Sequence, residues 1–258
     1  TMVKVYKIGG NVVDNPQALA TFLDEFARIP GPKVLIHGGG KEATRLCSRL
    51  DIPTQMIDGR RVTDAETLKV VTMVYAGLIN KRITAALQAR ECDAIGFSGA
   101  DAGCIRAVRR PAAPVDYGFV GDISTEGVDA ERILSFIEGG LTPVFCAITH
   151  DGNGNLLNCN ADSVAAAVAM GLARVTPTVL IYCFEKDGVL RDIDDPSSVV
   201  PRISHDTFDA LRADGTVSGG MIPKVENALR ALDAGVASVT IRKSDNILTP
   251  SGTVICDE

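Results

Sequence analysis

The sequence predicts an α/β protein, built on a mainly parallel sheet with helices on its faces. Apolar strand-like runs alternate with helical patterns, as at 3–9, 14–29 and 33–38, and this order is typical of parallel sheets covered by helices. Several of the runs end in glycines, as βα turns do. With 258 residues, 46% of them hydrophobic, the chain can bury a sizeable core.

The first elements follow from local signals. Residues 3–9, VKVYKIG, read as a strand, and the helix over 14–29 can be capped by Asp14 or Asn15, with Pro16 in its first turn. A second buried strand is predicted at 33–38. The next helix runs from about Lys41 to Leu50, where apolar residues recur on one side.

The longest helical pattern covers residues 63–90. Thr63 and Glu66 have the spacing of a capping box. The middle of the segment, VVTMVYAGLI, is apolar nearly all round, which indicates burial on more than one side. It is either a subunit interface or a central core helix, and the pattern alone does not decide between them.

The remaining predicted elements form two successive series of alternating strands and helices. We expect a strand at 94–99, a β-rich excursion over 104–123, a helix near 129–139, the strand PVFCAI, and an alanine-rich helix at ADSVAAAVAMGLA. A second βα series begins at TPTVLIYCF and closes with the helix MIPKVENALRALDAG and the strands SVTIRK and GTVIC. The boundary between two lobes is placed near 174–177, which divides the chain into 1–174 and 175–258.

Composition narrows the function classes. The net charge of −6 and the absence of a basic run argue against a nucleic-acid partner. The seven cysteines form no C-x-x-C pair, and we expect them reduced and mostly buried in a cytoplasmic protein. The three histidines lack metal-ligand spacing. No run approaches a membrane span, and a strand beginning at Val3 predicts no signal peptide.

The stretch VLIHGGGKEATRL, residues 34–46, resembles two known motifs: a phosphate-binding P-loop and the oxyanion loop of lipases and esterases. A P-loop is excluded, because its first glycine would fall on Leu35 and its Ser or Thr on Glu42.

The oxyanion loop of an α/β-hydrolase is a weak alternative for the same stretch. His37-Gly38-Gly39-Gly40 fits it, but the required nucleophile elbow is matched only by GFSGA, with Ser98 as nucleophile. That match ends in alanine, and no helical run follows it.

Glycine turns at strand ends give a third interpretation. KIGGN, HGGGK and FSGAD each follow a strand, and SGGM, with Gly219 and Gly220, precedes a helix. Ligands bind at the carboxyl ends of strands in open α/β sheets, and helix N-termini favour anions. The turns together predict one anion-binding crevice.

Two lysines sharpen this expectation. Lys7 lies inside an apolar strand, where burial is unfavourable unless an anion meets it, although an edge or snorkelling lysine is the alternative. Lys224 lies one turn into a helix, where a solvated lysine is the alternative. Phosphoryl transfer needs positive charge and alignment rather than covalent help from the protein. The pair therefore suggests a phosphotransferase.

The segments KIGGNVV, VLIHGGGKE, GRRVT, NCNAD and SGGMIPKV together resemble the amino acid kinase family, in order and over essentially the whole chain. Among its members, the chain is most similar to those that phosphorylate an N-acylglutamate. The resemblance implies a three-layer αβα open sandwich. Its N-terminal lobe would bind the acylglutamate and form the dimer, and its C-terminal lobe would bind ATP.

Carried over position by position, the resemblance assigns roles. The catalytic residues would be Lys7, Lys224 and Asp162. The Asp162 carboxylate would hold both lysines in place, although from sequence alone Asp162 also reads as a helix N-cap. Phosphoryl-binding residues would be Gly9, Gly10 and Gly39. The acylglutamate would contact Gly39, Gly40, Arg61 and Asn158, with Arg61 pairing a carboxylate as its guanidinium geometry suits. The nucleotide would contact Glu185, Lys186, Asp187, Gly188, Ser218 and Gly219.

The implied reaction is ATP-dependent phosphorylation of the γ-carboxylate of N-acetyl-L-glutamate, or a close N-acyl analogue, in arginine biosynthesis. Mg²⁺ would be held mainly by the ATP phosphates, with no protein metal site. The acyl group stays open between acetyl and succinyl. The loop FEKDGVL, 184–190, departs from the family's usual TDVPGV or SDVSGI, which also permits a non-catalytic sensor. A homodimer through the helix at about 64–90, insensitive to arginine, completes the expectation.

Overall fold

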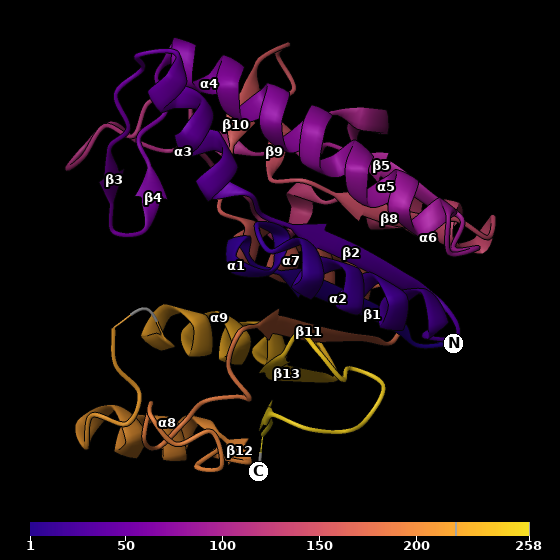
Figure 1. The fold of residues 1–258 in the computed structure, drawn as a ribbon, viewed down its shortest axis with the longest axis vertical. Coiled ribbons are helices and arrows are strands. Elements are labelled where there is room, and N and C mark those ends of the chain that lie inside the picture. The colour runs from indigo at the N-terminus through magenta and orange to yellow at the C-terminus, as the bar shows by residue number, and fades with distance from the viewer. Residues whose placement is uncertain (220, 258) are drawn as a thin grey trace.

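A computed structural model of the chain describes residues 1–219 and 221–257. Its central sheet has the strand order β12-β14-β13-β11-β1-β2-β8-β5 (Figure 1). The neighbouring strands run parallel except β13 and β14, which are antiparallel. The bounds are β1 (Val3–Ile8), β2 (Lys33–His37), β5 (Ala94–Phe97), β8 (Thr142–Phe145), β11 (Thr178–Phe184), β12 (Arg202–Ile203), β13 (Ser238–Lys243) and β14 (Thr253–Ile255). The predicted α/β class with a mainly parallel sheet is confirmed.

Helices cover both faces of this sheet. They are α1 (Gly10–Val13), α2 (Pro16–Arg28), α3 (Gly40–Arg49), α4 (Ala65–Val71), α5 (Asn80–Gln88), α6 (Ala130–Glu138), α7 (Ala161–Ala173), α8 (His205–Ala213) and α9 (Met221–Asp233). The helix expected over 14–29 is α2, and its N-cap is Asn15, whose side chain accepts from the N–H groups of Gln17 and Ala18. Gly220, one of the glycines expected at the anion site, lies outside the described residues.

In the part of the chain that the structure describes, three small hairpins stand outside the main sheet. They are β3 (Met56–Ile57) with β4 (Arg60–Arg61), β6 (Val108–Arg109) with β7 (Gly121–Asp122), and β9 (Ile148–His150) with β10 (Leu156–Asn158). The β6–β7 pair confirms the predicted β-rich excursion. The β3–β4 hairpin and helix α8 were not predicted, because their short segments carry no clear period.

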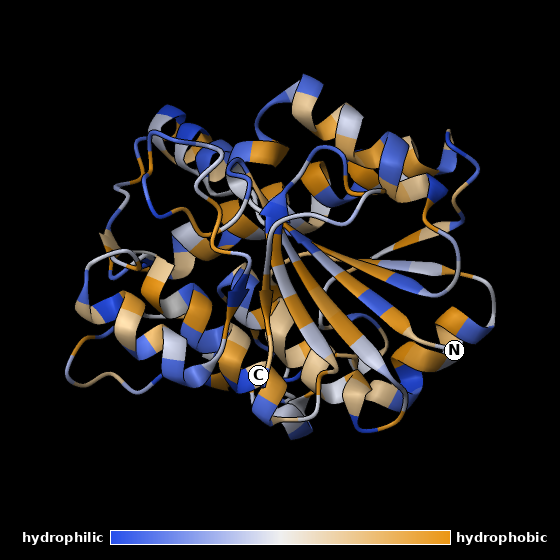
Figure 2. Cartoon of the chain, turned by 90° about the horizontal axis from the view of Figure 1, so that it is seen from below, coloured by the Kyte–Doolittle hydropathy of each residue, from blue (hydrophilic) through white to orange (hydrophobic). Residues whose placement is uncertain are grey.

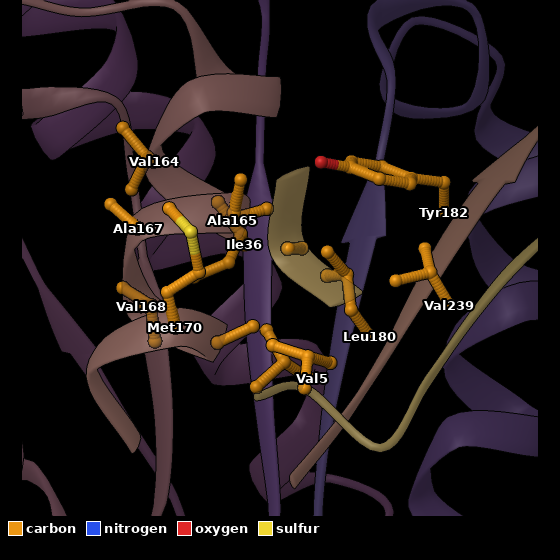
Figure 3. Packing of buried hydrophobic residues seen from close by; sticks show 14 of the residues in the cluster. Val5, Ile36, Val164, Ala165, Ala167, Val168, Met170, Leu180, Tyr182 and Val239 are labelled. Carbon is orange, nitrogen blue, oxygen red and sulfur yellow. The ribbon is translucent and has the colours of Figure 1, made fainter. Parts of the chain in front are cut away.

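The alternation of side chains along each strand divides the core into two clusters. Val5 of β1 packs with α7, whereas its neighbour Tyr6 packs with Phe22 and Phe26 of α2 on the opposite face. Small alanines let α7 pack closely against β1, β2 and β11 (Figure 3). Figure 2 shows the strands between the helices coloured largely as hydrophobic. The site described below therefore rests on a sheet buried on both sides.

The long helix predicted over 63–90 is observed, but it is not uniform. A π-helical segment, Thr72–Ile79, joins α4 to α5. The predicted capping box is wrong: Asp64 is the N-cap and its carboxylate accepts from Thr67 N at 2.7 Å. The Thr63 hydroxyl is used elsewhere: its oxygen accepts from Asn158 Nδ2 at 3.1 Å, and its proton is donated to the Arg61 carbonyl at 2.8 Å.

Two further expectations concern the whole chain. All seven cysteines are free and six are buried, as predicted. No helix in the described part of the chain is long and apolar enough to cross a membrane.

Candidate active site

Lys7 lies at the centre of the sheet. Strand β1 is flanked by β11 and β2, and Lys7 is in register with Tyr182 and Ile36. Only 8% of Lys7 is exposed. The alternative of an edge or snorkelling lysine is therefore wrong, and a buried ammonium here needs a partner.

That partner is Asp162, in the first turn of α7. Its two carboxylate oxygens bind different lysines: Oδ1 lies 2.7 Å from Lys7 Nζ, and Oδ2 lies 3.2 Å from Lys224 Nζ. The N-cap of α7 is Asn160, whose side chain accepts from the N–H groups of Asp162 and Ser163. Interpreting Asp162 as the helix N-cap is thus wrong, and its carboxylate is left for the lysines.

Lys224 is equally enclosed. It is in the first turn of α9, with its Nζ over the rings of Tyr182 and Phe184 at 5.3 and 5.9 Å. Only 15% of its side chain is exposed, against 10% for Lys7 and 24% for Asp162. The alternative of a solvated helix lysine is therefore wrong.

Burial and charge oppose each other in this triad. Burial favours a higher pKa for Asp162, but the ammonium groups of Lys7 and Lys224 outweigh it and hold that pKa well below its usual value. Burial lowers the pKa of Lys224, and the Asp162 carboxylate opposes this change. Two lysines and one carboxylate carry a net charge of +1, so the triad favours an anion beside it.

The first two glycine turns meet beside the triad. A methyl group added to Gly10 would lie 3.9 Å from Gly40 N, and one added to Gly38 would lie 3.9 Å from Gly10 N. One added to Gly9 would lie 3.5 Å from Lys7 Nζ. Because Gly10 and Gly40 open α1 and α3, their N–H groups have no partner within those helices. Free donors and the triad thus share one site.

A cleft of about 710 Å³ opens at this point. Its walls include Lys7, Asp162, Gly10, Gly38, Gly39, Gly40, Lys41, Thr44, Arg60, Arg61, Tyr75 and Asn158. In Figure 1 the β3–β4 hairpin and the start of α9 both lie at the carboxyl ends of the central strands. The cleft therefore occupies the position at which open α/β sheets bind ligands.

Arg61 presents unpaired donors inside this cleft. It is 6% exposed, and its Nη2 donates to the Gly40 carbonyl and to Thr44 Oγ1, both at 2.9 Å. Its Nε and Nη1 are buried without a protein partner among the described residues. A buried guanidinium with two free nitrogens matches a carboxylate.

Asn158 presents an unpaired acceptor. Its Nδ2 donates to Thr63 Oγ1 at 3.1 Å, and the hydroxyl proton of Thr63 is already used on the Arg61 carbonyl. Thr63 therefore accepts from Asn158, which fixes the orientation of the amide. Asn158 Oδ1 is left buried with no donor from the described chain, so it is available to a ligand N–H.

The residues expected at the nucleotide separate into two groups. Lys186, Gly188 and Ser218 line a second cavity of about 510 Å³, together with Met221 at the start of α9. Glu185, Asp187 and Gly219 do not line it. The Glu185 carboxylate lies near enough to Lys224 to favour a higher pKa for that lysine.

Helix α9 spans the two cavities. Met221 lines the second cavity and Lys224, three residues later, binds Asp162 at the first. Three residues of an α-helix rise about 4.5 Å. The first turn of α9 therefore joins the wall of the second cavity to the triad at the first.

Ser98 does not have the surroundings of a hydrolase nucleophile. Its hydroxyl donates to Asp101 Oδ2 at 2.8 Å, and the chain continues into a short 3₁₀ turn, Asp101–Gly103. His37, in the hydrolase-like loop, is bonded to Gly38 and Asn80 instead. The hydrolase interpretation is not supported.

The charged side chains lining the cleft are cationic except for Asp162. Among the described residues, no group of three or more His, Cys, Asp or Glu could hold a metal ion. The donor set that lines the cleft suits anionic ligands.

Some site residues were missed in the sequence. Thr44 and Thr63 orient Arg61 and Asn158 through their hydroxyl groups. Asn160 frees Asp162 by capping α7. Only Asn160 left a local signal, an Asn before a helical run; the threonine contacts join segments that are distant in sequence.

Comparisons with known proteins agree with this geometry. The sequence pattern of the amino acid kinase family matches residues 2–243. Acetylglutamate kinase of Bacteroides thetaiotaomicron is 51% identical over 97% of this chain and 97% of its own. That of Bacteroides fragilis is 50% identical over 97% and 95%. That of Methanopyrus kandleri is 37% identical over 98% and 100%.

Solved structures share the fold. Carbamate kinase from Giardia lamblia bound to AMP-PNP superposes with a TM-score of 0.71 at 16% identity, over 100% of this chain and 98% of that one. N-acetylglutamate synthase from Neisseria gonorrhoeae, complexed with coenzyme A and N-acetyl-glutamate, superposes with a TM-score of 0.82 at 23% identity, over 99% and 59%. The chain belongs to the amino acid kinase family.

Proposed function

We propose that the chain is an acetylglutamate kinase, which transfers the γ-phosphoryl group of ATP to the γ-carboxylate of N-acetyl-L-glutamate in arginine biosynthesis. The observation that carries this proposal is the pair Lys7 and Lys224, held on the two oxygens of Asp162 beside the free glycine N–H groups. Relatives named acetylglutamate kinase cover nearly the whole chain at about half identity.

The chemistry asks little of the protein beyond charge and alignment. The γ-carboxylate is ionised near neutral pH, so it attacks phosphorus without a general base. Negative charge on the moving phosphoryl group is met by Lys7, Lys224 and the N–H groups of Gly10 and Gly39. At an effective dielectric constant of about 20, a charge about 4 Å from a lysine is stabilised by about 4 kcal/mol. The products are ADP and an acyl phosphate.

The acceptor substrate matches the unpaired groups of the cleft. Its α-carboxylate would accept from Arg61 Nε and Nη1, which lack protein acceptors within the described chain. Its acyl amide N–H would donate to Asn158 Oδ1, which lacks a donor there. Gly40, also assigned to the acceptor substrate, lies beside Arg61, whose Nη2 donates to the Gly40 carbonyl. An N-acyl amino acid carries both complementary groups, in agreement with this assignment.

ATP would occupy the second cavity, beside Lys186, Gly188 and Ser218. Its γ-phosphoryl group would pass the start of α9 and reach Lys224. Mg²⁺ would be held by the ATP phosphates, because the described chain offers no carboxylate cluster for it. Glu185, Asp187 and Gly219 flank this cavity in sequence and are proposed as further nucleotide contacts.

The two cavities support a division of the chain into two lobes. We assign residues 1–174 to a lobe for the acylglutamate and dimerisation, and 175–258 to a lobe for ATP. The homodimer would form through the helix at about 64–90. Its π-helical segment buries Val74, Tyr75 and Ile79 in the chain but leaves Met73 and Leu78 53% and 37% exposed. We place the enzyme in the cytoplasm, since most of its cysteines are free and buried.

One assay tests the reaction and the acyl group together. Hydroxamate formation and ADP release are followed with N-acetylglutamate, N-succinylglutamate, glutamate and aspartate side by side. ATP-dependent turnover of N-acetylglutamate above the others is expected. Preference for N-succinylglutamate would change the substrate but keep the reaction. Binding of ATP without ADP release from any acceptor would favour a sensor.

The lysines are tested by replacement. Lys7→Ala and Lys224→Ala should abolish turnover while the protein stays folded by circular dichroism. Lys4→Ala is a matched control, because Lys4 lies in the same strand but does not line the cleft, and its Nζ donates to the Pro30 carbonyl at 3.2 Å. Full activity of either active-site variant would refute the proposed roles.

A further inference from the structure

A buried polar network lies behind the HGGG turn, outside the cleft. His37 ends β2 and is fully buried, and Asn80, also fully buried, begins α5. His37 Nε2 lies 3.1 Å from Asn80 Nδ2, and His37 Nδ1 lies 2.9 Å from the Gly38 carbonyl oxygen. Neither His37 nor Asn80 lines the cleft, so the reaction described above gives them no task.

The orientation of Asn80 is fixed by its other partners. Its Nδ2 donates to the Val144 carbonyl at 3.0 Å, and its Oδ1 accepts from Lys81 Nζ at 3.2 Å. A carbonyl accepts and an ammonium donates, so the amide cannot be turned over without losing both bonds. The group that faces His37 is therefore the Asn80 NH₂.

This orientation determines where the proton of His37 lies. Because Asn80 donates, His37 Nε2 must accept and carries no proton. The single proton of the neutral ring is then on Nδ1, which donates to the Gly38 carbonyl. Lys81 is the charged side chain nearest this network, and burial together with its charge disfavours the doubly protonated ring.

The bond to the Gly38 carbonyl also sets the direction of the next N–H group. The peptide joining Gly38 and Gly39 is planar and trans, so its N–H points opposite to its C=O. With the carbonyl held toward His37, Gly39 N–H points away from His37, and Gly39 lines the cleft. Gly39 N has no acceptor within the described chain.

The helix that carries Asn80 also supports Gly39 from the same side. A methyl group on Gly39 would lie 2.2 Å from Ile79 Cδ1 and 3.4 Å from Tyr75 Cδ1. Ile79 is the last residue of the π-helical segment, directly before Asn80. The closeness of this packing leaves the glycine backbone little freedom to turn.

We propose that His37 is a positioning residue for phosphoryl transfer: locked by Asn80 as the Nδ1–H tautomer, it holds the Gly38 carbonyl and thereby aims Gly39 N–H into the cleft. The proposal deepens the kinase function, on which it rests for the role of Gly39 N–H as a hydrogen-bond donor to the transferring phosphoryl group. The tautomer itself does not depend on that function.

The first test reads the tautomer without any activity. Long-range ¹H–¹⁵N correlation spectra of the ¹⁵N-histidine-labelled protein report which ring nitrogen carries the proton. His37→Asn identifies the signal among the three histidines. A pattern protonated at Nδ1 and unprotonated at Nε2 is expected. A ring protonated at Nε2 would overturn the proposal, whether or not the protein is a kinase.

The second test separates positioning from folding. In His37→Leu, which removes the donor, kcat is expected to fall about 10- to 100-fold with little change in KM for N-acetylglutamate. His37→Asn places an amide N–H near the former Nδ1 and should recover most of kcat. Exposed His205, bonded to Asp233, gives the control variant His205→Asn.

Three outcomes of the kinetic test would overturn the proposal. They are a wild-type kcat in His37→Leu, a His37→Asn variant as slow as His37→Leu at an equal melting temperature, and a loss confined to KM. If the unmutated protein has no kinase activity, the proposed function fails, and the tautomer spectrum still decides whether the network is arranged as described.

Discussion

Replacing Asp162 by asparagine removes the one negative charge between Lys7 and Lys224. The carboxylate lies 2.7 and 3.2 Å from the two ammonium groups and is 24% exposed. Breaking a buried ion pair costs about 3–5 kcal/mol, since a charge is left uncompensated. Burial already lowers the pKa of Lys224, so this lysine can release its proton in the variant. We therefore expect the lower end, a loss of about 3 kcal/mol in the free energy of unfolding.

The same release of a proton predicts the kinetics of Asp162→Asn. A neutral Lys224 no longer stabilises the phosphoryl group, and kcat should fall about 10²- to 10³-fold. Because protonation restores the charge, the residual kcat should rise as pH falls. Urea titration and ATP-dependent hydroxamate formation over a pH series measure both effects.

The control is Asp24→Asn. Asp24 pairs with Arg90 at 2.6 Å but is 53% exposed, and such surface pairs contribute about 0–1 kcal/mol. Its stability and kcat should stay close to those of the unmutated protein. A folded Asp162→Asn variant with unchanged kcat would refute the reasoning. So would a variant whose kcat decreases as the pH is lowered.

Four further predictions follow from the described contacts. Arg61→Lys should raise KM for N-acetylglutamate about 10- to 100-fold with a smaller change in kcat, because a lysine cannot make the paired bonds of a guanidinium; an unchanged KM would contradict the assigned carboxylate site. The pKa of His37 is lowered by burial from 6.5 to about 4, so below pH 6.5 the unfolded chain binds the extra proton. Stability from this residue is complete above pH 6.5 and falls by about 3 kcal/mol toward pH 4. In acid titrations this loss should be missing in His37→Asn and should therefore appear as the difference between the unmutated protein and the variant; equal losses in both would contradict it. Met73→Glu with Leu78→Glu should shift the protein from dimer to monomer in light scattering; an unchanged mass would exclude this seam. Gly96→Ala should lower stability by about 1–3 kcal/mol in thermal unfolding, since its methyl group would meet Asn80 Oδ1 at 2.1 Å, and a neutral effect would argue against the packing around Asn80.

Local patterns were sufficient for most of the sheet. The alternation of apolar strands and amphipathic helices predicted β1, β2, β5, β8, β11, β13 and β14 with small errors at their ends. Lys7 could be singled out because a lysine in a central apolar strand is unfavourable without a partner.

Other features depend on contacts that no local pattern records. Asp162 and Lys224 are 62 residues apart and meet only through the fold. Thr63 looked like a helix cap, but it is used to orient Asn158, and Asp64 takes the cap instead.

The π-helical turn at Thr72–Ile79 was likewise invisible in the sequence. An apolar run has the same composition in an α- or a π-helix, and here the wider turn packs Ile79 against Gly39. The β3–β4 hairpin, only two residues in each strand, was too short to show a period.

The central claim is that the γ-carboxylate of N-acetyl-L-glutamate attacks the γ-phosphorus of ATP between Lys7 and Lys224. It is tested most directly with substrate labelled by ¹⁸O in that carboxylate, followed by trapping of the product with hydroxylamine. Hydroxylamine attacks the acyl carbon and expels phosphate with the bridging oxygen. The account predicts one ¹⁸O atom in each phosphate released, by ³¹P isotope shift, and no labelled phosphate from Lys7→Ala. Unlabelled phosphate from the unmutated protein would mean that water, not the carboxylate, is the acceptor, and would contradict the account.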